Sequence, residues 1–110
     1  MPNLKIYVDE AIYPASREAL VGTLGDIHRL LCRDLDVPPA ACQIAMLPVV
    51  ALPDLPRIGV ELHILPRPDR TRDMLTDLSL RLRDLLFAAS GVAVAVRVSL
   101  LDPQTCVALK

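Results

Sequence analysis

Aromatic side chains are almost absent from this chain. Its 110 residues include no tryptophan, one phenylalanine and two tyrosines, although 53% of the residues are hydrophobic. A core built from this composition has to be aliphatic, made of Leu, Val, Ile and Ala. The length suits one domain over residues 1–110. So high an apolar fraction on so short a chain also indicates that part of the surface is buried against further copies of the chain.

An excess of charge of one sign is lacking as well. The chain has 12 basic and 13 acidic residues and a formal net charge of -1, so no basic surplus points to nucleic acid. No apolar run approaches the length of a membrane span. The N-terminus does not have the charged-then-apolar layout of a signal peptide. These absences predict a cytoplasmic protein with neither a nucleic-acid nor a membrane partner.

Cysteines are few, and no motif for a cofactor is apparent. Cys32, Cys42 and Cys106 form an odd set without metal-type spacing. We expect at least the first two to be buried free thiols, because free cysteine is among the most buried residue types. No cluster of His, Asp or Glu has the spacing of metal ligands, and no glycine-rich loop could cradle a phosphate. The sequence therefore predicts neither a metal nor a cofactor.

Hydrophobic periodicity is the strongest signal that is present. Alternation of apolar and polar residues predicts four strands, at 3–8, 41–49, 57–65 and 92–101. Leucines at helical spacing predict two helices. The first covers about 16–35, opened by Pro14 or capped by Ser16. The second covers about 70–89, capped by Asp69 and closed at Gly91. The tail after the last strand could add a short edge strand.

The order strand, helix, strand occurs twice, over about 1–52 and 57–110. Each half reads as a βαβ unit with parallel strands and a right-handed crossover. The predicted fold is an α+β two-layer sandwich, with a four-stranded mixed sheet and two helices on one face. The other face would present small, largely apolar residues and needs a partner, for which a closed homo-oligomer is the simplest solution. These residues are Ala45, Gly59, Ala93 and Ala95.

A proline, Pro2, follows Met1 directly ahead of the first strand. Proline commonly starts a strand because it cannot donate to the ladder. If Met1 is removed, however, the ring nitrogen becomes a secondary amine. A free α-amine titrates at about pH 8. Its pKa falls on burial or beside arginines, which suits a base that moves a proton at carbon. A chain that keeps Met1 would have this nitrogen blocked as an amide.

Met-Pro joined to a strand and followed by a duplicated βαβ plan resembles the tautomerase superfamily over essentially the whole chain. The resemblance implies a tautomerase/MIF-like fold, an amino-terminal proline as catalytic base or acid, and a homotrimer. The segment YPASR…DIHR, with His28, looks like the helical histidine segment of the cis-3-chloroacrylic acid dehalogenase subgroup. In LPRPDR, Arg67 and Arg70 stand three apart, like the arginines that bind the substrate carboxylate in that subgroup.

Other subgroups show partial likenesses and departures. The malonate semialdehyde decarboxylase subgroup also has two arginines in this loop, and the ending CVALK is loosely similar to 5-carboxymethyl-2-hydroxymuconate isomerases. The dehalogenases activate water with a glutamate far along the chain, whereas no acid follows Asp102 here. Gln43 stands where the small 4-oxalocrotonate tautomerases carry an arginine. The missing acid weighs against hydration and dehalogenation, and Gln43 is a departure from the small tautomerases.

The resemblance makes Pro2, His28, Arg67 and Arg70 the candidate catalytic residues. The two arginines would also bind the substrate, since a guanidinium grips a carboxylate bidentately and stabilises an enolate. Arg70 is expected in the first turn of its helix, where a cation is unfavourable to the dipole, which hints at another use. His28 lies near an apolar helix face, so it is either a satisfied boundary residue or a proton relay.

The predicted function is a cofactor-free tautomerase acting on a small 2-oxo or enol carboxylate. One alternative is decarboxylation, or hydration and dehalogenation, of a 3-carbon acid on the same scaffold. Another is a non-catalytic oligomeric binding protein. The roles of four further polar residues stay open: Tyr7, Tyr13, His63 and Arg97.

Overall fold

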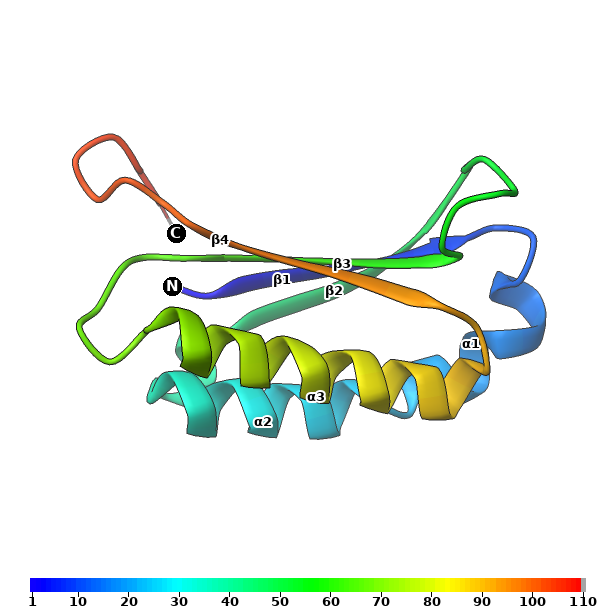
Figure 1. Ribbon diagram of the computed structural model, residues 1–110, viewed down its shortest axis with the longest axis horizontal. Coiled ribbons are helices and arrows are strands. Elements are labelled where there is room, and N and C mark those ends of the chain that lie inside the picture. The colour runs from blue at the N-terminus through cyan, green and yellow to red at the C-terminus, as the bar shows by residue number, and fades with distance from the viewer. Residues whose placement is uncertain (110) are drawn as a thin grey trace.

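Four strands form one mixed sheet, and the helices cover one of its faces (Figure 1). The computed structural model describes residues 1–109. In chain order the elements are β1 (Asn3–Asp9), α1 (Tyr13–Val21), α2 (Leu24–Leu35), the 3₁₀ turn η1 (Pro39–Ala41), β2 (Gln43–Val49), β3 (Ile58–Ile64), α3 (Arg72–Ser90) and β4 (Val94–Leu100).

The strand order is β2-β1-β3-β4. β1 runs parallel to β2 and β3 runs parallel to β4, while the central pair β1 and β3 is antiparallel. Each parallel pair is the product of one βαβ unit, and the antiparallel seam joins the two units. The predicted α+β sandwich, with a mixed sheet of duplicated βαβ units, is therefore confirmed.

The period of two in each strand places alternate aliphatic residues on the helix side of the sheet. The side chains that β1 and β3 send to that side are buried, from Leu4 at 0% exposure to Val60 at 2%. Leucines of α2 and α3 meet them there, and the buried cluster is aliphatic apart from one cysteine. Its fully buried large members are Leu4, Ile6, Leu20, Ile27, Leu31, Leu35, Ile58, Leu62, Ile64, Leu78, Leu82 and Leu86.

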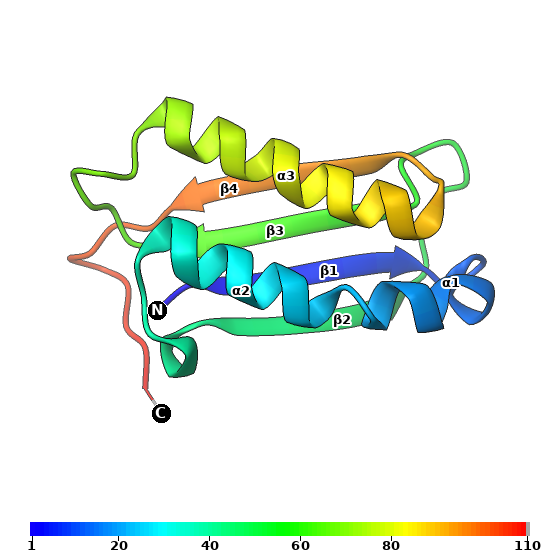
Figure 2. The same cartoon turned by 90° about the horizontal axis from the view of Figure 1, so that it is seen from below.

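The first predicted helix is in fact two helices, so three helices rather than two lie against the sheet (Figure 2). The break falls at Gly22 and Thr23. The Thr23 backbone N–H donates to Leu20 O at 3.0 Å and its side-chain hydroxyl donates to the same oxygen at 2.6 Å. This tight turn interrupts the α-helical ladder, because the hydroxyl competes for a helix carbonyl.

The start of α3 also differs from the prediction. Thr71, not Asp69, is the N-cap, and its hydroxyl accepts the Met74 backbone N–H at 3.2 Å. Arg70 therefore lies in the preceding loop, and Arg72 is the cation in the first turn. The other end is as expected: Gly91 closes the helix in the left-handed conformation, with φ 71°.

The uncovered face of the sheet is more polar than the sequence suggested. Ala45 and Ala95 are exposed there, and Gly59 is half-buried. The register, however, aligns Ala45, Lys5, Glu61 and Arg97 across the four strands, so a charged row crosses the face. The predicted edge strand of the tail is not formed over the described residues 101–109. No helix within residues 1–109 is long and apolar enough to span a bilayer.

Candidate functional site

The start of β1 and the loop that follows β3 meet at one end of the sheet (Figure 2). The antiparallel register pairs Asn3 with His63, which puts Pro2 beside the end of β3. Pro2 is buried, and its carbonyl accepts the Gln43 backbone N–H at 2.9 Å. The loop 65–71 leaves this same end and carries Arg67 and Arg70. The fold thus brings three of the four candidate residues to one end of the molecule.

Arg70 is built into the protein rather than extended into solvent. Its side chain is buried, and two of its N–H groups donate to backbone carbonyls, Leu65 O at 2.6 Å and Leu35 O at 3.2 Å. The Nε atom is buried without a hydrogen-bond partner among the described residues. Burial, followed by the charge of Arg67, lowers the pKa of this guanidinium, and Asp69 opposes them. Arg70 therefore ties the loop to the last turn of α2.

Arg67 is the more available of the two arginines. Its side chain is 38% exposed and lies 3.6 Å from a carboxylate oxygen of Asp36 and 3.6 Å from one of Asp69. It also donates to Asp36 O at 3.2 Å. Both carboxylates are themselves exposed, at 88% and 55%. Ion pairs this long and this exposed are weak, so a ligand carboxylate could replace them.

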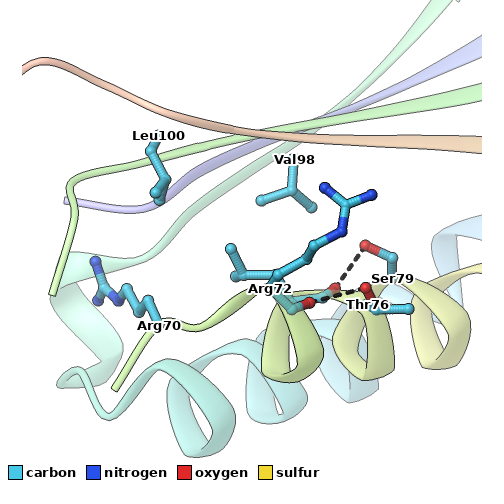
Figure 3. A pocket seen from close by; sticks show the side chains of 7 residues that line it. Arg70, Arg72, Thr76, Ser79, Val98 and Leu100 are labelled. Atoms are coloured by element: carbon cyan, nitrogen blue, oxygen red, sulfur yellow. Dashed lines mark hydrogen bonds between the residues drawn. The ribbon is translucent and has the colours of Figure 1, made fainter. Parts of the chain in front are cut away.

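A groove of about 420 Å³ runs from Arg70 along the side of α3 to the edge strand β4 (Figure 3). Its volume falls in the range of small-molecule sites, about 300–1,000 Å³. The guanidinium groups of Arg70 and Arg72 point toward different ends of the groove. The hydroxyls of Thr76 and Ser79 donate to carbonyls of their own helix, each at 2.8 Å. Arg72 was not singled out from the sequence, because a helix-start arginine has no distinguishing pattern.

His28, the fourth candidate, is held by a different set of neighbours. Its Nε2 lies 3.0 Å from Pro39 O and 3.8 Å from the Cys32 sulfur. With Cys42 these residues form a compact group of donor atoms on the β2 side of α2. Burial and the neighbouring Cys32 raise the pKa of Cys42 to about 11. In residues 1–109 the structure records no hydrogen bond from His28 to Pro2, Arg67 or Arg70.

The four polar residues whose roles the sequence left undecided lie on other surfaces. Tyr7, Glu61 and Arg97 line a hollow of about 260 Å³ on the uncovered sheet face. The Tyr7 hydroxyl donates to Glu61 at 3.4 Å, and burial followed by the Glu61 charge raises its pKa. His63 is exposed on the same face. Tyr13 begins α1, beyond the opposite end of β1. His63 pairs with Asn3 at the end of the sheet that holds Pro2, but its side chain lies on the uncovered face, whereas Pro2 is buried.

The sequence matches no protein-family model and no curated protein. The structure, by contrast, matches solved structures over nearly its whole length. A macrophage migration inhibitory factor-like protein from Entamoeba histolytica is 12% identical, with a TM-score of 0.70, over 94% of this chain and 91% of that one. A fused 4-OT, solved as a symmetric trimer, is 18% identical, with a TM-score of 0.67, over 90% and 85% of the two chains. N1, a member of the cis-3-chloroacrylic acid dehalogenase family, is 18% identical, with a TM-score of 0.67, over 96% and 79%.

At identities this low the matches establish the fold alone. The chain shares its fold with these three proteins, in agreement with the tautomerase/MIF-like fold predicted from its sequence. The same fold occurs in a domain of unknown function from Sebaldella termitidis. Activity therefore has to be argued from the site and not from the architecture.

Proposed function

We propose that this chain, which has the fold of the tautomerase superfamily, is an isomerase that moves a proton on a small 2-oxo or enol carboxylate, with the amine of Pro2 as the base. The observation that supports this most is the placement of Pro2 beside the arginine loop 65–71 at one end of the sheet. Keto–enol transfer requires a base such as an amine and a cation that binds the substrate carboxylate and stabilises the enolate.

The proposed chemistry starts with removal of Met1, which frees the ring nitrogen of Pro2. The neutral amine accepts the proton from the enol hydroxyl or from the carbon next to the carbonyl, and the protonated amine returns it at the other position. Burial of Pro2 and the positive charges of Arg67 and Arg70 favour the neutral amine between turnovers. The same charges stabilise the enolate that forms during the transfer.

The two arginines have different roles in this proposal. Arg67 binds the substrate carboxylate, because its contacts to Asp36 and Asp69 are long and easily exchanged. Arg70 is mainly a positioning residue, because two backbone carbonyls already hold its side chain. An assisting role for His28 stays a prediction, since its ring contacts Pro39 and Cys32.

A homotrimer is part of the proposal. The fused 4-OT neighbour is a symmetric trimer. In this chain the β2–β3 connection exposes Val50, Leu52 and Leu55, and the sheet has an uncovered face. Light scattering behind a sizing column tests the trimer. A cytoplasmic location is also part of the proposal, and cell fractionation tests it.

The activity test begins with mass spectrometry, to confirm that the preparation lacks Met1. The tautomerisation of phenylenolpyruvate is then followed by ultraviolet absorbance. Replacing Pro2 by Ala should lower kcat/KM by about 10²–10⁴-fold, the usual contribution of a general base. Replacing Arg67 by Ala should mainly raise KM. Arg83→Ala is the matched control, because Arg83 is exposed on α3 and lies 3.9 Å from Asp84 in an equally loose pair.

Four results would contradict the proposal. Full turnover by Pro2→Ala would show that Pro2 is not the base. An Arg67→Ala effect no larger than that of Arg83→Ala would show that Arg67 does not bind the substrate carboxylate. Turnover of malonate semialdehyde in place of the enol would favour the decarboxylase. No turnover of either compound by protein lacking Met1 would favour a binding protein.

A further inference from the structure

One imidazole and two thiol side chains, all of them groups that can ligate a metal, converge at the seam between α2 and the segment that leads into β2. His28 and Cys32 are four residues apart on α2 and so lie on one face of the helix, and Cys42 immediately precedes β2. One donor atom from each residue lies within 4.8 Å of the other two. Cys42 is buried, whereas His28 and Cys32 are half-buried, so the group is partly accessible to solvent through the two α2 residues.

The spacing is close to that of a tetrahedral zinc centre. With Zn–S near 2.3 Å and Zn–N near 2.0–2.1 Å, two donors on a tetrahedral ion are about 3.5–3.8 Å apart. The Cys32 sulfur and His28 Nε2 are 3.8 Å apart. The 4.8 Å limit on all pairs leaves at most about 1 Å of closure, which rotation of partly exposed side chains supplies.

We propose that His28, Cys32 and Cys42 form a zinc site that ties α2 to the start of β2, with water or an external donor in the fourth position. Thiolate and imidazole donors favour Zn²⁺ over the hard cations Mg²⁺ and Ca²⁺. Two Zn–S bonds and one Zn–N bond form as water molecules leave the hydrated ion. The two thiol protons leave to solvent, and neither the ion nor a residue changes oxidation state.

The histidine is arranged to switch between two partners. In this structure the His28 Nε2–H donates to Pro39 O at 3.0 Å. If Nε2 binds zinc, its proton moves to Nδ1 and the bond to Pro39 O is exchanged for the metal bond. The proposed zinc site does not depend on the proposed tautomerase activity, because it is measured without substrate.

Zinc uptake is measured on the full chain, under a reductant that does not bind metal, by competition with a chromophoric chelator. One Zn²⁺ should bind per chain. Substituting Co²⁺ should give thiolate-to-cobalt charge-transfer absorption and the intense visible bands of a tetrahedral site. Loss of a residue that only hydrogen-bonds to a metal ligand costs about 10–100-fold in affinity, so loss of a ligand itself in Cys32→Ser or His28→Gln should cost at least about 100-fold.

Cys106→Ser and His63→Gln are the matched controls, because both side chains are exposed and lie outside the group. Both should bind zinc as the unmodified chain does. Cys42→Ala is a second ligand variant, and Cys32→Ser covers the case in which loss of the buried Cys42 prevents folding. Absence of stoichiometric uptake would overturn the proposal, and so would uptake that survives Cys32→Ser and His28→Gln or is lost in Cys106→Ser.

Discussion

Replacing Arg70 by Met should destabilise the protein far more than the same change at Arg67. Methionine keeps much of the length of the side chain but removes every donor. In Arg70→Met the carbonyls of Leu35 and Leu65 lose their charged partner, in a position where the arginine is only 7% exposed. Hydrogen bonds to charged groups contribute about 1.5–3 kcal/mol each.

The expected loss in the free energy of unfolding is smaller than the sum of the two hydrogen bonds. Methionine also removes the desolvation cost of the buried charge and of its unpartnered Nε. We therefore expect a net loss of about 2–4 kcal/mol in the free energy of unfolding. For a domain of this size that lowers Tm by roughly 8 °C or more. In Arg67→Met the contacts are exposed and loosely held, and the expected loss is below about 1 kcal/mol.

Urea unfolding of both variants and the unmodified chain, at one protein concentration and with the oligomeric state checked, gives the comparison. Hydrogen exchange should locate the Arg70→Met effect in the last turn of α2 and the end of β3, where the two carbonyls lie. Equal losses in the two variants would refute the reasoning, as would an Arg70→Met protein within about 0.5 kcal/mol of the unmodified chain, the range of ordinary surface changes.

Three more predictions concern stability. The pKa of Asp9 is lowered chiefly by the Ala11 N–H and then by Arg57. The stability that this carboxylate contributes is therefore present above the unfolded carboxyl pKa, about 3.9, and is lost as pH falls through the folded pKa. Urea unfolding at a series of acid pH values should show this loss in the unmodified chain, and Asp9→Asn should lack it. Gly91→Ala forces alanine to φ 71° and should cost about 1 kcal/mol in thermal unfolding, while Gly25→Ala inside α2 should cost nothing. Leu62→Ala, at a fully buried position, should cost about 2–5 kcal/mol in urea, against a small effect for the 40% exposed Leu80→Ala.

Local patterns in the sequence were sufficient for most of the secondary structure. Alternation in β1 and β3 and the leucine spacing of α2 and α3 reflect which face each element buries, and that information lies within a few residues. The predictions that failed concern places where neighbouring residues compete for one helix carbonyl or one cap position. The Thr23 hydroxyl interrupts the first helix, and Thr71 takes the cap position from Asp69. Several capping-type residues stand close together at each place, so composition does not single one out.

The candidate site was only partly readable. The motif LPRPDR made the two arginines candidates, but the burial of Arg70 and the exposure of Arg67 depend on carbonyls contributed by other segments. His28 and Cys32 share a helix face at a spacing that could have been noticed. Cys42 completes the group only through the packing of α2 against the chain entering β2.

The sequence by itself determined the alternating strands, the aliphatic core and the two βαβ units, because each rests on the periodicity of a continuous stretch. The tertiary structure alone decided that Pro2 lies beside the arginine loop, that Arg70 is buried, and that His28, Cys32 and Cys42 converge. Those features join residues far apart in the chain. Strand register and loop path place them, and neither is encoded in the residues of any single element.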